Sequence, residues 1–261
     1  MTATAGVVAL VRRPGPRLHE GLVTHLERVP VDGALALRQW EGYCDALRAA
    51  GWTLVEVPGA DDCPDAVFVE DTVVVFRNVA VITRPGAESR RPETGDVEKV
   101  LESLGCSLNR IVAPGTLDGG DVLKVGDTVY VGRGGRTNAE GIRQLRAMLT
   151  PLGATVVSVP VHKVLHLKSA VTALPDGSIV GHPHVVDDRG RFPRFVPVPE
   201  ESGGHLVLLG GARVLMAADC PRTAAQLEDL GYEVTVVDIG EFQKLEGCVT
   251  CLSVRLRHLA G

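Results

Sequence analysis

The sequence predicts an α/β fold in which five ββαβ-like units close around one axis, on the strength of two recurring strand patterns and one helix pattern. One kind of strand is a short β-branched run that ends near a proline or a turn. The other kind precedes it in each unit, and an amphipathic stretch commonly lies between the two. The order strand, strand, helix, strand repeats about five times, at intervals of roughly 40 to 55 residues.

The other kind of strand, which precedes the β-branched run in each unit, is rich in valine. Three examples follow hairpin signals, in FRNVAVIT, KVGDTVYVG and LPDGSIVG. These strands are expected at residues 7–15, 79–86, 129–134, 178–183 and 213–221. The β-branched runs that complete the units are expected at residues 55–58, 111–114, 157–160, 195–199 and 236–240.

Helices are expected where apolar residues recur three and four apart and the stretch ends at glycine. Such stretches span residues 40–51, 94–105, 137–153 and 222–231, and the fourth unit has none. Thr137 precedes Glu140 by the spacing of a capping box, so we expect it to be an N-cap. No segment looks like a linker, so residues 1–261 are expected to form a single domain, with strand ends and loops meeting at its centre.

Composition narrows the class of partner. The chain has 261 residues, a formal net charge of -5 and only 4% aromatic residues. An acidic chain with few aromatic side chains is a poor match for nucleic acid or an anionic membrane surface. No apolar run approaches the roughly 18 residues of a membrane span, and the basic pair in MTATAGVVALVRRPG follows the apolar run, the wrong order for a secretory signal. A cytoplasmic protein is expected, with its six cysteines reduced.

Two reactive residue types stand in informative surroundings. Cys248 and Cys251 lie in KLEGCVTCLSVRL, where C-x-x-C is typical of buried thiols, a redox dithiol or half a zinc site. The chain has no second C-x-x-C, and the following residues indicate a strand rather than a helix, so this segment alone favours a core strand. His166, in VHKVLHLKSAV, is expected at the end of a strand, and by itself it is compatible with a structural role or, with His162, a metal site.

Acidic residues next to apolar runs point to a cationic ligand. Asp65, Glu70 and Asp71 surround the start of a strongly apolar strand, with no basic residue beside them. A buried carboxylate is costly unless a cation, hydrogen bonds or a ligand compensates it. Asp118 and Asp121 flank a Gly-Gly pair, and Asp121 also fits a solvated edge turn.

Arginines provide the complementary charge. Arg90 follows RPGAES and Arg136 ends GRGGR, just before an expected helix. Surface arginines are common, but the guanidinium group is also the side chain best suited to binding a carboxylate through two hydrogen bonds.

Taken together, these segments resemble the dimethylarginine dimethylaminohydrolases of the guanidino-modifying (pentein) superfamily. The resemblance extends over essentially the whole chain, from LVRRPGPRLHEGL at 10–22 to the C-terminal cysteine segment. Its motifs are FVEDT at 68–72, ITRPGAESRR at 82–91, TLDGGD at 116–121, RTNAEG at 136–141, LHLK at 165–168 and LEGCVTCLS at 245–253. The family's fold, a five-bladed pseudosymmetric α/β propeller, agrees with the fivefold strand pattern.

The resemblance assigns roles to individual residues. It implies that Cys251 is the nucleophile, that His166 is the catalytic histidine and that Asp118 orients this histidine. For the substrate it implies guanidinium-binding acids at Glu70, Asp71 and nearby Asp65, carboxylate-binding arginines at Arg90 and Arg136, and main-chain contacts at Leu22 and Leu245.

The resemblance also implies a reaction: hydrolysis of N-omega-methylated arginine to citrulline and dimethylamine or methylamine, with no cofactor or metal. An arginine or agmatine deiminase is the nearest alternative, and a non-catalytic thiol protein using Cys248 and Cys251 is one of another class. Cys248 departs from the family pattern, and we hypothesise that it pairs with Cys251 under oxidation. A monomer and a homodimer are both compatible with the sequence.

Overall fold

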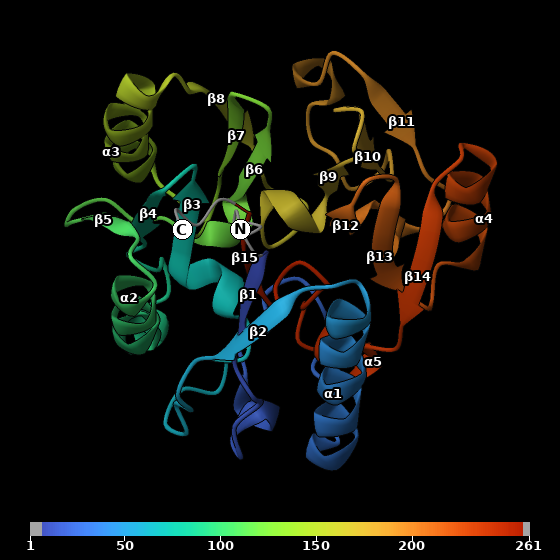
Figure 1. The fold of residues 1–261 in the computed structure, drawn as a ribbon, viewed down its shortest axis with the longest axis horizontal. Coiled ribbons are helices and arrows are strands. Elements are labelled where there is room, and N and C mark those ends of the chain that lie inside the picture. Colours follow the sequence, from blue (N-terminus) through green and yellow to red (C-terminus); the bar gives the residue numbers. More distant parts are fainter. Residues whose placement is uncertain (1–6, 258–261) are drawn as a thin grey trace, which may run out of the picture.

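The computed structural model of the chain describes residues 7–257. They form five small three-stranded sheets, called blades below, around a central axis (Figure 1). In chain order the strands are β1 (Val8–Val11), β2 (Thr53–Glu56), β3 (Val73–Phe76), β4 (Val79–Ile82), β5 (Ser107–Arg110), β6 (Val122–Val125), β7 (Thr128–Arg133), β8 (Thr155–Pro160), β9 (Val171–Ala173), β10 (Ile179–Gly181), β11 (Phe195–Pro197), β12 (Val207–Gly210), β13 (Arg213–Ala217), β14 (Glu233–Val237) and β15 (Val254–Leu256). The blades are β15-β1-β2, β3-β4-β5, β6-β7-β8, β9-β10-β11 and β12-β13-β14, which confirms the predicted five-bladed α/β propeller.

Every blade pairs its strands in the same way. Its innermost strand is antiparallel to the middle strand, and the middle strand is parallel to the outer one. A parallel pair needs a crossover connection, which a helix supplies in four of the blades. The helices are α1 (Gly33–Ala49), α2 (Thr94–Ser103), α3 (Ala139–Leu149) and α4 (Pro221–Asp229), with a short α5 (Gly240–Gln243) before the last turn. The connection from β10 to β11 contains only the 3-10 turn Arg189–Arg191, as predicted for the fourth unit.

Side chains that cap the helices move two helix starts away from their expected positions. α1 begins well before residue 40, because the Asp32 carboxylate accepts hydrogen bonds from the first backbone N–H groups of the helix. Asn138, not Thr137, caps α3 and accepts from the N–H of Gly141. The Thr137 hydroxyl instead donates to Asp121 at 2.6 Å, so the predicted capping box is wrong.

The strand expected at 111–114 is also wrong, since β5 ends at Arg110 and pairs in parallel with β4. β5 is the outer edge of its blade, and its side chains are exposed or half-buried. A strand in that position needs no apolar run, so its polar sequence SLNR carries no signal.

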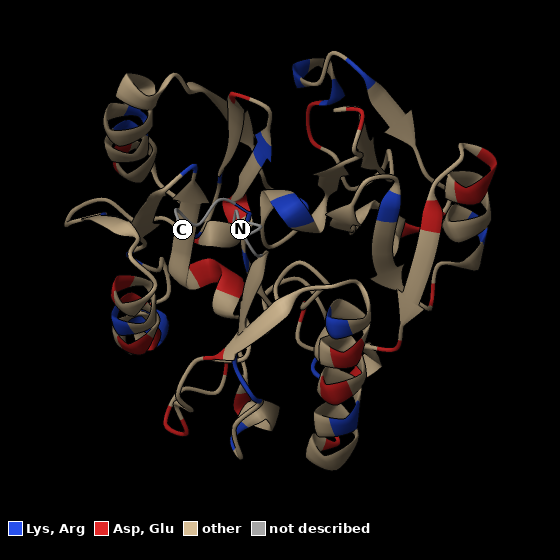
Figure 2. Ribbon diagram, in the orientation of Figure 1, with Lys and Arg blue, Asp and Glu red and all other residues tan. Residues whose placement is uncertain are grey.

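The core is divided among the five gaps between neighbouring blades, with one apolar cluster in each gap. In β1, Val8 and Leu10 face one neighbouring blade while Ala9 and Val11 face the other. Because alternate side chains are buried on both faces, the strands read as continuous apolar runs rather than alternating ones. Charged residues lie mainly on the helices and outer loops (Figure 2). Within residues 7–257, no helix has the length and apolar character needed to cross a bilayer.

Candidate active site

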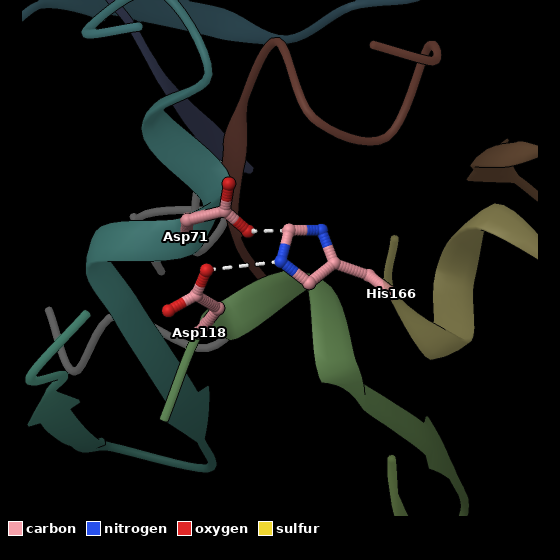
Figure 3. A group of neighbouring side chains, drawn as sticks. All are labelled: Asp71, Asp118 and His166. Atoms are coloured by element: carbon pink, nitrogen blue, oxygen red, sulfur yellow. Dashed lines mark hydrogen bonds and ion pairs between the residues drawn. The ribbon is translucent and has the colours of Figure 1, made fainter. Parts of the chain in front are cut away.

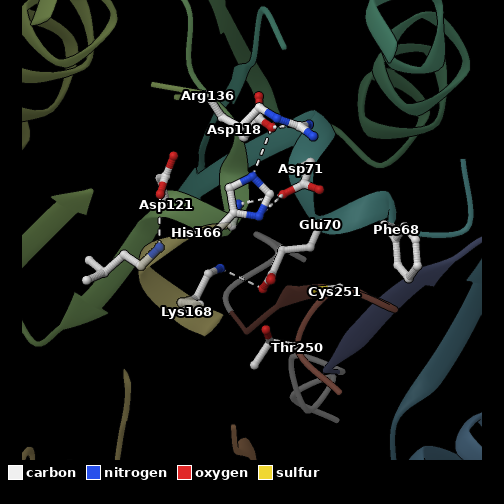
Figure 4. A network of polar contacts seen from close by, with 12 residues as sticks. Phe68, Glu70, Asp71, Asp118, Asp121, Arg136, His166, Lys168, Thr250 and Cys251 are labelled. Atoms are coloured by element: carbon white, nitrogen blue, oxygen red, sulfur yellow. Dashed lines mark hydrogen bonds and ion pairs between the residues drawn. The ribbon is translucent and has the colours of Figure 1, made fainter. Parts of the chain in front are cut away.

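The predicted catalytic residues, and Asp71 of the predicted substrate-binding residues, all lie just before the innermost strand of a blade. Asp71 lies in a short 3-10 helix before β3, and Asp118 immediately precedes another before β6. His166 lies in a loop before β9, not at the end of a strand as expected, and Cys251 ends a turn before β15. The repeated blade topology therefore brings four segments that are distant in sequence together at one end of the axis (Figure 4).

Cys251 and His166 line the same small pocket, so the sulfur and the imidazole face one cavity. The pocket is also lined by the predicted substrate residues Leu22, Asp65, Asp71, Arg90, Arg136 and Leu245 and by Phe68, Leu165, Glu246 and Gly247, which the sequence did not single out.

Two glycines make the close approach of these segments possible. A Cβ atom on Gly119 would lie 2.0 Å from the carbonyl oxygen of Glu70. A Cβ atom on Gly120 would lie 2.7 Å from both Asp71 Oδ1 and His166 Nδ1. The Gly-Gly pair of TLDGGD is therefore a packing requirement of the site, since any side chain at Gly120 would push the acid and the imidazole apart.

His166 lies between two buried carboxylates (Figure 3). Its Nε2 lies 2.9 Å from Asp118 Oδ2, and its Nδ1 lies 3.8 Å from Asp71 Oδ1. Burial alone lowers the pKa of His166, but the charge of Asp71 and the hydrogen bond with Asp118 raise it to about 9. The imidazole is therefore protonated near neutral pH, with its Nε2–H donated to Asp118.

Arginines balance the two aspartates. Arg90 is buried and its Nη1 donates to Asp71 Oδ2 at 2.7 Å, while Arg136 Nη1 lies 3.6 Å from Asp118 Oδ2. Burial raises the pKa of Asp71, but His166 and Arg90 outweigh it and hold the pKa well below its usual range. The ligand-type atoms of Asp71, Asp118 and His166 lie within 4.8 Å of one another, a spacing that would also suit a metal ion. Here the positive charges of the arginines and the imidazolium already compensate the carboxylates.

The two predicted carboxylate-binding arginines differ in how many of their N–H donors already make hydrogen bonds within the protein. Arg90 also donates to Glu93 through Nε and Nη2 and to the carbonyl oxygens of Asp65 and Phe68. By contrast, Nη1 of Arg136 is buried and makes no hydrogen bond within the described residues 7–257. Arg136 therefore has the freer donor, whereas Arg90 mainly fixes the position of Asp71.

The loops at the pocket are joined by hydrogen bonds to carboxylates. Asp65 Oδ1 accepts from the N–H of Leu22 at 2.9 Å, and burial raises the pKa of Asp65. Glu246 accepts from the N–H groups of Thr24 and His25. The chain after Leu22 is thus held against the loop that contains Glu246, on the side of the pocket formed by these two segments.

Glu70 is the predicted substrate residue that does not line this pocket; it faces a channel along the central axis. Its Oε1 accepts from Lys168 Nζ at 2.6 Å (Figure 4) and also from Arg255 Nη2 at 2.8 Å. The expectation that this acid and Asp71 have no basic partner is wrong, because the partners come from distant parts of the chain. A direct contact between Glu70 and the substrate stays a prediction.

The two neighbouring cysteines share a hydrogen bond, with Sγ atoms 3.3 Å apart. This bond lowers the pKa of Cys248 to about 5 and raises that of Cys251 well above its ordinary value. Because the sulfurs share one proton, the pair loses its first proton more easily than an isolated thiol and its second less easily. These shifts favour the remaining negative charge on Cys248, and transfer of the shared proton across the 3.3 Å contact would place that charge on Cys251, the sulfur that lines the pocket.

Asp121 supports the site from behind, although the sequence suggested a solvated turn. It is buried and accepts from the hydroxyl of Thr137 and from the N–H of Leu167, the residue after His166. Burial raises the pKa of Asp121 to about 6. The one signal in the sequence that could have indicated burial of Asp121 was its position between Gly-Gly and an apolar strand, which lies inside the folded protein.

Comparison with known proteins identifies the class first. The family model described as arginine deiminase matches residues 57–207, more than half of the chain. A curated N(G),N(G)-dimethylarginine dimethylaminohydrolase of Streptomyces coelicolor is 70% identical over 251 residues, which cover 96% of this chain and 97% of the relative. The protein of the same name from Pseudomonas aeruginosa is 39% identical, covering 94% of this chain and 98% of the relative.

Solved structures agree. The structure of the Pseudomonas aeruginosa enzyme, a cysteine-to-serine mutant complexed with citrulline, superposes with a TM-score of 0.89 at 37% identity, covering 95% of this chain and 98% of that one. The chain therefore belongs to the dimethylarginine dimethylaminohydrolase family.

Proposed function

We propose that this protein hydrolyses N-omega-methylated arginines, asymmetric dimethylarginine and monomethylarginine, to citrulline and dimethylamine or methylamine. The observation that carries the proposal is the single pocket lined by the sulfur of Cys251, the imidazole of His166, buried aspartates and Arg136. Family membership, with a relative at 70% identity, supports the same reaction.

Substrate binding follows from the charges around the pocket. Asp71 and Asp65 supply negative charge for the guanidinium group, and Arg136 supplies a donor for the substrate carboxylate. Arg90 lies in the wall, where its main action is to hold Asp71. The main-chain groups of Leu22 and Leu245 lie in loops that border the pocket and can contact the substrate. Holding the guanidinium carbon against a nucleophile contributes several kcal/mol through proximity, up to about 7–11 in the best cases.

The chemical steps use the chain's own side chains. The thiolate of Cys251 attacks the guanidinium carbon and gives a tetrahedral adduct. His166, protonated by virtue of its raised pKa, transfers its proton to the departing amine and leaves a covalent thiouronium. The neutral imidazole then takes a proton from the water that attacks this intermediate, and citrulline departs as the thiolate is restored. Asp118 keeps the ring oriented and stabilises its cationic form.

The test is a citrulline assay with asymmetric dimethylarginine, monomethylarginine, arginine and agmatine in parallel. We expect methylated arginine to be preferred, and Cys251→Ser and His166→Ala to lose roughly a thousandfold or more in kcat. Cys106→Ser, which changes a thiol away from the pocket, is the matched control and should keep its activity.

Each alternative predicts a different pattern in the same assay. Arginine deimination, the activity suggested by the name of the matching family model, predicts arginine as the preferred substrate. Agmatine turnover comparable to that of dimethylarginine would remove the role of the carboxylate-binding arginines. A thiol protein without this hydrolytic activity predicts no citrulline and equal importance of Cys248 and Cys251.

We further infer a cytoplasmic enzyme made of one domain and acting as a monomer or homodimer. All six cysteines are unpaired in the structure, which agrees with a reducing compartment. Light scattering on the purified protein would distinguish the two oligomeric states.

A further inference from the structure

The axis of the propeller encloses a second cavity, separate from the pocket that contains Cys251. It is lined by the innermost strand of every blade, β3, β6, β9, β12 and β15, and has a volume of about 510 Å³. Glu70 and Lys168 lie at its inner end, next in sequence to the active-site segments that contain Asp71 and His166 (Figure 4). The channel and the pocket that contains Cys251 are therefore separate cavities, with the segments around Glu70 and Lys168 between them.

The charge in this channel is strongly unbalanced. Five cationic side chains line it but only two carboxylates, Glu70 and Asp127, and Asp127 pairs with Arg77. The other four cations are Lys124, Lys168, Arg255 and Arg257. Lys168 and Arg255 both pair with Glu70. In the part of the chain that the structure describes, Lys124 and Arg257 have no carboxylate within salt-bridge distance.

Backbone carbonyls are the hydrogen-bond partners of these two cations, and the guanidinium carbon of Arg257 also lies 4.9 Å from the centre of the Trp52 ring. Lys124 Nζ donates to the carbonyl oxygen of Val75, and Arg257 Nη2 donates to that of Leu208 at 2.8 Å. A carbonyl group satisfies a donor without neutralising its charge, so cations held near one another inside a protein remain costly. Burial and then the charges of Lys168 and Arg255 lower the pKa of Lys124 to about 7, and burial and Arg255 lower that of Arg257 to about 10.

An anion in the channel would remove this cost. The hydroxyl-bearing residues Thr172, Thr250 and Ser253 also line the cavity, but their hydroxyl groups already bond to Gly204, Cys248 and Tyr43 respectively. The ammonium and guanidinium groups are therefore the donors that an anion would use. Several cationic donors around a chamber of this size suit a compact, doubly charged group with oxygen acceptors on every side. Glu70 at the inner end would repel such a group from the active-site floor.

We propose that the central channel is a binding site for a small tetrahedral oxyanion of the inorganic phosphate class, held by Lys124, Arg257 and Arg255. The site is independent of the proposed hydrolysis, because none of these three residues lines the pocket that contains Cys251. An occupied channel would stabilise the folded protein and the inner strands on which the active-site segments rest.

The experiment is thermal unfolding of the full-length protein in increasing inorganic phosphate, with sodium chloride adjusted to keep the ionic strength constant. The pH should be about 6.5, where most of Lys124 is charged. We expect a saturable rise in Tm, roughly 3–6 °C at ten times the dissociation constant. Lys124→Met and Arg257→Gln should each weaken the apparent affinity about tenfold, measured also by calorimetric titration of the folded proteins.

Two control variants separate this site from other anion sites. Lys99→Met makes the same substitution on the exposed face of α2, and Arg136→Gln removes a guanidinium group from the active-site pocket; both should keep the full response to phosphate. The proposal is overturned if Tm shows no saturable rise, if both channel variants respond like the unmodified protein, or if Arg136→Gln alone abolishes the response. Two independent channel variants are used so that, if one has a folding defect, the other still tests the site.

Discussion

Replacing Asp118 with asparagine should shift the pH dependence of catalysis, because this carboxylate helps hold the proton on His166. The Asp118 side chain is fully buried, and its Oδ2 lies 2.9 Å from the imidazole Nε2. A hydrogen bond to a charged group contributes about 1.5–3 kcal/mol, and one pKa unit corresponds to about 1.4 kcal/mol. The variant should therefore lower the pKa of His166 by about one to two units from its value of about 9.

The sign of the shift follows from the proposed role of the imidazolium as the proton donor to the leaving amine. The rate should fall as pH rises through the pKa of His166, near pH 9 in the unmodified enzyme and near pH 7–8 in the variant. The kcat at neutral pH should also fall by roughly 10²–10⁴-fold, because asparagine no longer favours the productive state of the ring.

The same group links pH to stability. The pKa of His166 is higher in the folded protein than the ordinary value of 6.5, so its contribution is complete below that pH and is lost as pH rises toward about 9. Thermal unfolding between these values should therefore show a smaller pH dependence in the variant than in the unmodified protein.

The assay is kcat/KM for asymmetric dimethylarginine as a function of pH, with Asp127→Asn as the control. Asp127 is an exposed aspartate paired with Arg77, and its replacement should leave the profile unchanged. An alkaline limb at the same pH in Asp118→Asn and the unmodified enzyme would refute the assignment of that limb to the proton on His166.

Three further predictions follow from single contacts. Arg90→Gln should lower the free energy of unfolding by about 3–5 kcal/mol, because it leaves buried carboxylates unpaired, whereas the neighbouring Arg91→Gln, at a half-buried surface pair, should cost less than about 1 kcal/mol by chemical denaturation. Gly120→Ala should reduce kcat at least about tenfold by displacing the acid and the imidazole, while Gly42→Ala, where a Cβ atom meets nothing within 4 Å, should not. Hydrogen peroxide should inactivate the enzyme reversibly by forming a disulfide between Cys248 and Cys251, a mass loss of about 2 Da that Cys248→Ser cannot show.

The balance of the peroxide reaction makes its outcome measurable. One thiolate attacks peroxide and breaks its O–O bond, giving a sulfenic acid and hydroxide, and the second thiol then displaces water from the sulfenic acid to form the S–S bond. A dithiol reductant should restore both the mass and the activity. Inactivation at the same rate and with the same reversal in Cys248→Ser would contradict a role for the neighbouring thiol.

For the buried ion pair of Arg90, the contradicting result would be an Arg90→Gln variant whose free energy of unfolding equals that of the unmodified protein.

The blade architecture was predictable because its physical cause repeats along the chain. Both faces of most strands pack into the gaps between blades, so runs such as Val73 to Phe76 are apolar throughout and are easily recognised. β5 was misplaced because an exposed edge strand has no such requirement. The start of α1 was missed because its N-cap, Asp32, lies outside the apolar periodicity that marked the helix.

The candidate site was harder to predict from the residues themselves. Cys251 and His166 each looked more like core residues when considered alone, and the family resemblance connected them. Closure of the propeller brings the segments before the inner strands together, and no local pattern encodes that meeting. The same holds for the partners of Glu70, since Lys168 and Arg255 become its neighbours only through the closed ring.

The most direct measurement of the central claim is mass spectrometry of enzyme quenched with acid during turnover of asymmetric dimethylarginine. A covalent adduct equal in mass to the substrate without dimethylamine should be found on the peptide that contains Cys251, and it should be absent from Cys251→Ser. An enzyme that releases citrulline while this sulfur stays unmodified under every quenching time, or an adduct on Cys248 instead, would contradict nucleophilic attack by Cys251.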